Sequence, residues 1–282
     1  MEPRDLGSPA PWRRLLASRS FAIGGVLLVA IALAAVFAPV LAPYDPLRGN
    51  FRLRLSPPGP LHWLGTDHFG RDILSRLLFG ARLSLAIGAA TTVASGLLGA
   101  LIGAPAGYFR RLDEPLMRLM DALMAFPAIL LAMAIAATLG ASVGNVIIAL
   151  AIATTPHTAR VVRASVLVVR ELEFVEAARS IGATETRILL RHVLLNCLGP
   201  LIVRLTYVFA IAVLAEAALS YIGVGPPPPA PSFGNIIAGG RDFLVTAPWI
   251  TIAPGSAIIA IVLALNLLGD GLRDVLDPRL RI

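Results

Sequence analysis

Two long stretches of the chain, residues 21–42 and 83–107, contain no ionisable side chain. The hydrocarbon core of a bilayer is about 30 Å thick, and about 20 apolar residues in a helix cross it. Lipid offers no hydrogen-bond partner to free backbone groups, so such segments cross as helices or as closed barrels. We therefore predict an all-α polytopic membrane protein with six transmembrane helices. The remaining apolar stretches are residues 119–139, 143–153 with its polar continuation 154–160, 201–221 and 247–268.

Composition supports the membrane interpretation. The chain is 57% hydrophobic and 15% charged, whereas soluble domains are about 45–50% apolar and about 25% charged. All 24 basic residues are arginine, and the absence of lysine excludes a P-loop nucleotide site and lysine-based covalent chemistry in this chain. Any ATP that drives this protein must therefore be bound by another chain. The single cysteine, Cys197, is expected to pack as a small apolar residue.

The arginines also orient the chain. With the N-terminus inside, 17 of the 24 arginines lie on the inner side and 7 on the outer side, as the positive-inside rule requires. We therefore expect both termini in the cytoplasm. The first apolar stretch is longer than the core of a signal peptide, so we expect it to be retained. The predicted segments are a cytoplasmic N-terminal segment 1–20, a first transmembrane helix 21–42, an outer segment 43–82, a five-helix core 83–270 and a cytoplasmic tail 271–282.

The stretch between the fourth and fifth predicted helices favours two short helices joined by a glycine. Glu176, Ala177 and Ala178 lie in a helix-forming run that Gly182 interrupts, and Thr184 is placed to cap a new helix. Small side chains allow a close approach, so the segment is suited to dock into a groove of another protein. From the residues alone, a surface loop that packs against lipid headgroups is an equal alternative.

The spacing within this stretch is specific. The Glu-Ala-Ala run 176–178 is followed after three residues by Gly182 and after nine more by His192. This pattern resembles the cytoplasmic signature of binding-protein-dependent ABC import permeases, although Leu195 and Gly199 stand where relatives usually carry proline. Further segments resemble the C type of permease in the dipeptide, oligopeptide and nickel branch of that family. These segments are residues 62–85, 118–127, 231–244 and 266–280.

The resemblance implies an ABC type I importer permease fold with a coupling loop, residues 171–198, that docks on ATP-binding subunits. The coupling residues it implies are Glu176, Ala177, Ala178, Gly182 and His192. It implies as partners a homologous second permease subunit, two ATP-binding subunits or one fused ATPase, an extracytoplasmic substrate-binding protein, and the lipid bilayer of a bacterial cytoplasmic membrane. ATP and Mg²⁺ would be held by the ATPase, and no cofactor or nucleic acid is expected in this chain. The expected cargo is a dipeptide or oligopeptide, with nickel or another small solute as the alternative.

The outer segment 43–82, called the scoop below, is too long for a simple connector. It contains two triplets in which glycine permits a positive φ and aspartate bonds to nearby backbone. The triplets are Gly65-Thr66-Asp67 and Gly70-Arg71-Asp72. They predict a well-tied loop, which by resemblance contacts the binding protein or guards the translocation route. His62 and His68 lack a third nearby ligand, so no metal site is expected.

Two acids lie inside predicted spans, where ionisable groups are costly and mark partners or water-filled paths. Asp121 and Glu216 are therefore candidates for the translocation pathway. The alternative is that both serve as local ion pairs, or that Glu216 faces a cavity. The arginines within reach are Arg118, Arg160 and Arg163 for Asp121, and Arg71 and Arg82 for Glu216.

An ion-gradient-driven secondary transporter is a rival interpretation. It requires paired intramembrane charges and inverted repeats, and the sequence shows neither. An intramembrane enzyme is disfavoured because HExxH and Gly-x-Ser-x-Gly motifs are absent. We therefore predict a transporter subunit without catalytic residues of its own.

Overall fold

The computed structural model describes residues 18–276, which form helices joined by loops, with no strand in that range beyond one isolated bridge between Thr66 and Asp72. The longer helices are α2 (Arg19–Val36), α4 (Ile73–Tyr108), α5 (Arg110–Met124), α6 (Ala128–Leu139), α7 (Val143–Val169), α11 (Leu198–Tyr221) and α13 (Trp249–Leu276). The shorter helices are α3 (Ala38–Leu41), α8 (Glu173–Ser180), α9 (Glu185–Ile188), α10 (Leu194–Asn196) and α12 (Phe233–Gly240), with 3-10 turns at Phe51–Leu53 and Arg241–Phe243 and a π turn at Leu189–Val193. Of the predicted terminal segments, residues 1–17 and 277–282 lie outside the described residues.

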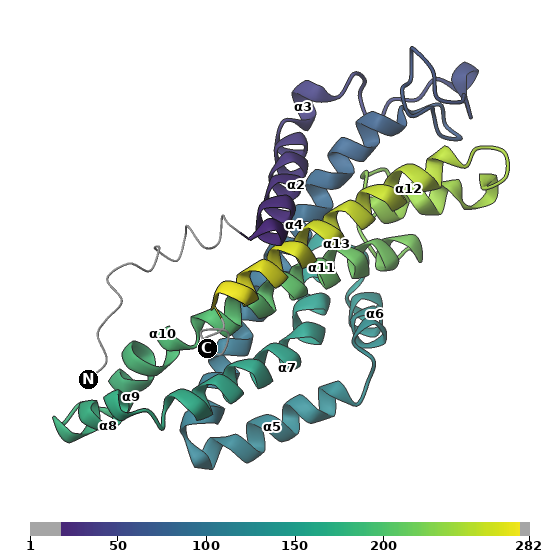
Figure 1. Cartoon of the computed structure of the whole chain (residues 1–282). Helices are drawn as coiled ribbons and strands as arrows, with labels where there is room; N and C mark the ends of the chain where they lie inside the picture. The colour runs from purple at the N-terminus through teal and green to yellow at the C-terminus, as the bar shows by residue number, and fades with distance from the viewer. Residues whose placement is uncertain (1–17, 277–282) are drawn as a thin grey trace.

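The long apolar helices confirm the predicted fold class. Within residues 18–276, five helices are long and apolar enough to cross a membrane, namely α2, α4, α7, α11 and α13. The pair α5 and α6 makes a sixth crossing if its two helices count as one span. In Figure 1, α4, α11 and α13 run along the length of the molecule, with α8–α10 at one end and the scoop and α12 at the other.

The third span departs from the single helix predicted over residues 119–139. The structure bends this region by 85° between α5 and α6, because Pro127 lies at the N-cap of α6 and has no backbone N–H to continue the helix. The 12 residues of α6 reach only about 18 Å, short of the hydrocarbon core. Helix α5 is amphipathic, and acidic side chains on it form ion pairs with arginines of α7.

Two other helices have different lengths from those expected. Helix α4 begins at Ile73, inside the predicted scoop, and its 36 residues span about 54 Å. Its two ends therefore lie at opposite ends of the molecule (Figure 1). The first predicted span is divided into α2 and α3 at Phe37, because Pro39 cannot donate a hydrogen bond to the preceding turn.

Helices α4 and α7 pack closely through glycines. Gly99, Gly103 and Gly107 recur every four residues, the spacing that places small residues on one face of a membrane helix. A Cβ at Gly103 would lie 2.3 Å from the carbonyl oxygen of Ala159, and one at Gly99 would lie 2.6 Å from Cγ2 of Thr158. The missing side chains thus set the separation of the two backbones.

Replacing Gly103 with alanine is expected to destabilise the protein by roughly 1–3 kcal/mol, because the new methyl group must push α7 away. The measurement is thermal unfolding of the purified protein in detergent. Gly144→Ala is the matched control, since a Cβ there meets nothing within 4 Å. Equal melting temperatures for the Gly103 and Gly144 variants would show that this contact yields without cost.

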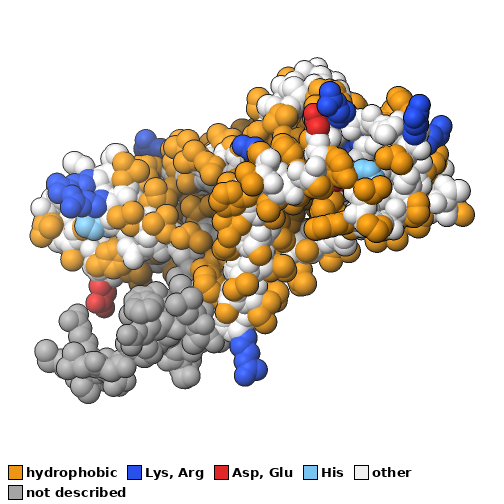
Figure 2. Space-filling model, turned by 90° about the horizontal axis from the view of Figure 1, so that it is seen from above, with side chains coloured by type: hydrophobic (Ala, Val, Ile, Leu, Met, Phe, Trp, Pro, Cys, Tyr) orange, Lys and Arg blue, Asp and Glu red, His pale blue; other side chains and the backbone are white. Residues whose placement is uncertain are grey.

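The surface fits a protein that faces lipid and partner helices. Hydrophobic side chains cover most of the face seen in Figure 2, and arginines gather mainly toward the ends of the molecule. Val26, Val40, Leu101, Ile252 and Ile259 are all more than half exposed. Exposed apolar area of this extent marks an interaction surface rather than a surface that faces water.

Candidate functional sites: the scoop and the coupling loop

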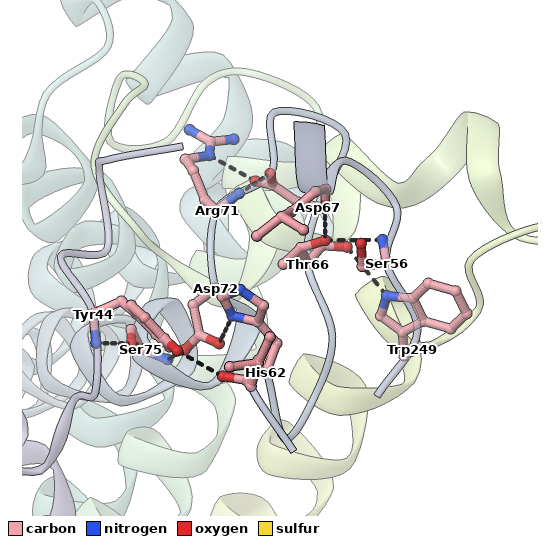
Figure 3. A network of polar contacts seen from close by, with 11 residues as sticks. Tyr44, Ser56, His62, Thr66, Asp67, Arg71, Asp72, Ser75 and Trp249 are labelled. Carbon is pink, nitrogen blue, oxygen red and sulfur yellow. Dashed lines mark hydrogen bonds and ion pairs between the residues drawn. The ribbon is translucent and has the colours of Figure 1, made fainter. Parts of the chain in front are cut away.

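The carboxylate of Asp67 holds together several parts of the scoop (Figure 3). Its carboxylate accepts hydrogen bonds from the backbone N–H groups of Phe69, at 2.8 Å, and Arg71, at 2.9 Å. The guanidinium of Arg71 donates to the same carboxylate at 2.6 Å, and Nε of Arg76 lies 3.8 Å away. Because Asp67 and Arg76 are both buried, this carboxylate balances charge that water does not reach.

Thr66 ties the scoop together and joins it to the distant helix α13. Its hydroxyl donates to the carbonyl of Leu53 and accepts from the backbone N–H of Ser56 at 2.9 Å. Its carbonyl accepts from the indole of Trp249, at the start of α13, at 3.1 Å. Gly65 has a φ of +75°, which lets the chain turn directly into this position.

Asp72 lies in the scoop directly before the first residue of α4. Its carboxylate accepts from the backbone N–H and the hydroxyl of Ser75, both at 2.7 Å, and it is therefore the N-cap of the helix. Nδ1 of His62 lies 2.9 Å from the same carboxylate. The backbone N–H of Tyr44 donates to the Ser75 hydroxyl at 3.1 Å. The well-tied loop predicted from the two triplets is what these contacts build.

Neither scoop histidine lies in a metal-ligand cluster. His62 bonds to Asp72, whereas His68 stacks on Phe243 with ring centroids 5.6 Å apart. Among residues 18–276 there is no group of three or more histidine, cysteine, aspartate or glutamate side chains arranged to hold a metal ion.

A cavity of about 720 Å³ lies between the scoop and the segment around α12. Its volume is in the range of small-ligand pockets. The sequence did not reveal this cavity, because its walls come from two segments, within residues 47–76 and 220–239, that are far apart in the chain. Phe51, His68, Arg71 and Arg76 line it from the scoop, and Tyr221 and Asn235 line it from the other side.

Burial lowers the pKa of His68 below its ordinary value of 6.5. Asp67 opposes this shift, whereas Arg71, Arg76 and Arg54 reinforce it. A depressed histidine pKa means that the unfolded chain binds the proton more tightly than the folded chain does. The contribution of His68 to folding stability is therefore fully present above pH 6.5 and decreases as the pH falls below that value.

We expect the melting temperature to fall when the pH is lowered from about 7.5 to about 5.5. Tryptophan fluorescence reports on the scoop, because the indole of Trp249 bonds to Thr66. His68→Phe keeps an aromatic ring against Phe243 and removes the titrating group, so the fall in this variant should be smaller. If the melting temperature of the variant depends on pH as the wild type does, titrating groups other than His68 cause the dependence.

Glu216 is fully buried between helices and forms no ion pair with Arg71 or Arg82. Its carboxylate accepts hydrogen bonds from the hydroxyl of Ser84, on α4, at 2.6 Å and from the hydroxyl of Ser220, on α11, at 2.7 Å. Arg71 is instead paired with Asp67. Ser220 lines the outer cavity, so Glu216 lies behind its wall.

Asp121 forms an ion pair with Arg160, one of the pairings considered from the sequence. Both side chains are about half exposed, and they join α5 to α7. Close by, Nη2 of Arg163 donates to Asp113 at 2.6 Å across the same helix pair. Asp121 therefore has a structural partner, and its role in the pathway stays a prediction.

The coupling loop has the predicted form. Helices α8 and α9 meet at Gly182, whose φ of +81° lies in the left-handed region. Thr184 is the N-cap residue of α9, but its side chain makes no capping hydrogen bond. A π turn that contains His192 then leads through α10 into α11.

The predicted coupling residues differ in exposure. Glu176, Ala177 and Gly182 are exposed, and His192 is partly buried. Ala178 instead packs into the apolar cluster below the loop, so of the two alanines only Ala177 is open to a partner. This cluster also contains Val166, Val175, Ile188 and Val193. Ile181, which the sequence did not single out, is 85% exposed beside Gly182.

Family models match most of the chain. The model described as "binding-protein-dependent transport system inner membrane component" matches residues 95–282, and the model described as "N-terminal TM domain of oligopeptide transport permease C" matches residues 10–58. This chain belongs to the binding-protein-dependent transport system inner membrane component family. The first match contains the whole coupling loop.

Curated relatives extend the match to nearly full length. A putative peptide transport system permease protein of Brucella suis is 56% identical over 96% of this chain and 91% of the relative. The dipeptide transport system permease protein of Alkalihalophilus pseudofirmus is 41% identical over 96% of this chain and 91% of the relative. The glutathione transport system permease protein of Pectobacterium atrosepticum is 40% identical over 96% and 90%.

The fold agrees with a solved transporter. The inward-facing MetNI methionine ABC transporter matches with a TM-score of 0.57 at 21% identity, over 72% of this chain and 97% of that chain. The predicted ABC type I importer permease fold is confirmed. As a member of this family, the chain is a permease subunit of an ABC transporter and not itself an enzyme. The family works in the inner membrane with ATPase and substrate-binding partners.

Proposed function

We propose that this chain forms one half of the translocation pathway of an ATP-driven peptide importer. The observation that carries this proposal is the 56% identity to a putative peptide transport permease over 96% of the chain. Relatives named for dipeptides and for glutathione, itself a small peptide, favour short peptides as the cargo. Nickel or another small solute is the alternative within the same branch.

Each proposed partner has its own contact region on this chain. The second half of the pathway is a homologous permease subunit, and the exposed apolar faces of α4 and α13 suit a helical partner. Two ATP-binding subunits, or one fused ATPase, hold ATP and Mg²⁺ and dock on the coupling loop. An extracytoplasmic binding protein docks at the scoop. Both termini lie in the cytoplasm of a bacterium, as the arginine distribution supports.

Transport by such a protein requires two orientations that differ in their contacts with the partners. Closure of the ATPase acts on the exposed surface that includes Glu176, Ala177 and Ile181. Delivery of the cargo acts on the scoop. Helix α4 joins the two regions, since it begins at Ile73 in the scoop and ends at Tyr108 beside the coupling loop.

Reconstitution of the complete complex in proteoliposomes tests the proposal. We expect uptake of a labelled dipeptide that requires ATP, the ATP-binding subunits and the binding protein together. Labelled glutathione and ⁶³Ni²⁺ are measured in parallel. If the complex takes up nickel but neither peptide, the cargo is nickel and the peptide proposal is wrong. Uptake by this chain alone under an ion gradient would overturn the ATP-driven mechanism.

A further inference from the structure

Three side chains join the coupling loop to the end of α4. The hydroxyl of Tyr108, the last residue of α4, donates to the carboxylate of Glu185 on α9. Nε of Arg179, on α8, donates to the other oxygen of that carboxylate at 3.2 Å. Nη2 of Arg179 lies 3.5 Å from the Tyr108 hydroxyl oxygen. We call these three residues the clasp.

The clasp closes over the apolar contacts that already hold the coupling loop. Val175 and Ile188, one from each short helix, are fully buried in the cluster below the loop, against which the ring of Tyr108 packs. Nearby, Nη1 of Arg170 donates to the carbonyl of Gly107 at 2.7 Å, which fixes the end of α7 to the end of α4. Apolar packing does not fix the orientation of the loop relative to α4. The hydrogen bonds of the clasp depend on orientation and therefore do.

The position of the clasp matters because Gly182 lies between its two charged members. Arg179 precedes this glycine and Glu185 follows it, so their ion pair holds α8 and α9 at a fixed angle, and Tyr108 ties both to α4. Pro105 lies one turn before Tyr108 and lacks the N–H that would bond to the preceding turn. The end of α4 therefore lacks one hydrogen bond of its own helix, and the clasp adds contacts there.

The charge state keeps the clasp formed at neutral pH. The hydrogen bond from Tyr108 and the ion pair with Arg179 hold the pKa of Glu185 below its ordinary value of 4.5. A depressed carboxylate pKa stabilises the folded arrangement above the ordinary value and loses that effect as the pH falls through the depressed value. At neutral pH the carboxylate is therefore ionised and accepts both hydrogen bonds.

We propose that Tyr108, Arg179 and Glu185 are positioning residues that make the coupling loop and α4 move as one body. When an ATP-binding subunit displaces the loop, the clasp transfers the displacement to α4 and so to the scoop at its far end. This proposal rests on the proposed function, because it assumes that ATPase subunits dock on the loop.

The ratio of dipeptide transported to ATP hydrolysed by the reconstituted complex tests the clasp. In Tyr108→Phe the ring still packs but the hydroxyl is gone, and we expect the ratio to fall about three- to fivefold. Glu185→Gln should behave alike, and Glu185→Asp should recover part of the ratio. Tyr207→Phe is the matched control, because it removes a hydroxyl that bonds to Asp270 at 2.6 Å elsewhere in the protein. Equal ratios in Tyr108→Phe and Tyr207→Phe would overturn the proposal.

A spectroscopic measurement separates the clasp from the proposed function. Leu190→Cys gives an attachment site for a nitroxide label that is 57% exposed and is not among the residues assigned to the ATPase contact. The native Cys197 is buried with its pKa raised to about 11, which disfavours labelling there. In the complete complex we expect the label to become more mobile with Tyr108→Phe and not with Tyr207→Phe. If the wild-type complex transports no peptide but this difference appears, the proposed cargo fails and the clasp stands. If the mobility does not change, the clasp fails whatever the cargo.

Discussion

Replacing Asp67 with alanine is expected to cost the protein roughly 3–5 kcal/mol of folding stability, because it leaves buried positive charge without its counter-charge. Arg71 loses a partner at 2.6 Å, and Arg76, which is only 3% exposed, loses the carboxylate 3.8 Å from its Nε. The backbone N–H groups of Phe69 and Arg71 also lose their acceptor. We expect the scoop to lose its fixed structure, with the start of α4 frayed.

Chemical or thermal unfolding of the purified protein measures this effect, with hydrogen exchange of residues 62–76 to localise it. Asp67→Asn is the informative comparison, because its amide oxygen still accepts from the backbone while the charge is gone. It should fall between the wild type and the alanine variant. Wild-type stability in Asp67→Ala would mean that the two arginines reach water or another acid when Asp67 is removed.

Replacing Gly182 with valine is expected to lower ATP-driven uptake about tenfold while the subunits still assemble. A non-glycine residue in the left-handed region costs roughly 1–2 kcal/mol, and a β-branched one is especially disfavoured there. A Cβ at Gly182 meets nothing within 4 Å, so the effect comes from the backbone and not from a clash. The chain relieves the strain by changing φ, which alters the angle between α8 and α9.

Uptake of labelled dipeptide and binding-protein-stimulated ATP hydrolysis are measured together for this variant. Gly182→Asn is the matched control, since asparagine adopts the left-handed conformation more readily than other residues, and it should keep most of the activity. Gly182→Asp has the same tolerance and adds a charge on the exposed surface, so a loss there beyond that of asparagine reports on the docking surface itself. Full transport by Gly182→Val would show that the loop angle does not matter.

The fold was predictable wherever a local pattern was sufficient. Apolar runs of about 20 residues indicate spanning helices whatever they pack against. Four of the runs found in the sequence lie mostly within α2, α4, α11 and α13. The bend at Pro127 was missed because residues 119–139 look continuous by hydropathy, although proline and the charges of α5 argue against one straight helix. The four-residue spacing of Gly99, Gly103 and Gly107 is also visible in the sequence, but the helix they pack against is not.

At the sites, local backbone conformation was predictable from the sequence, whereas contacts between side chains far apart in the chain were not. The positive φ values of Gly65 and Gly182 follow from glycine in turn-forming runs, and the carboxylate of Asp72 at the start of a helix follows from capping preferences. By contrast, Glu216 accepts from Ser84, 132 residues earlier in the chain, and nothing local to either residue predicts that contact. The clasp was missed for the same reason, since Tyr108 and Glu185 are 77 residues apart.

By itself, the sequence determined that this chain is a helical membrane subunit without nucleotide chemistry of its own, because hydropathy, charge and residue type act locally and need no knowledge of neighbours. Its family resemblance, carried by short motifs, likewise lay in the order of the residues. Only the tertiary structure decided which buried charges are balanced, where the outer cavity lies and how the coupling loop is fastened to α4. Those features depend on contacts between distant segments, and such contacts are set by how whole helices pack.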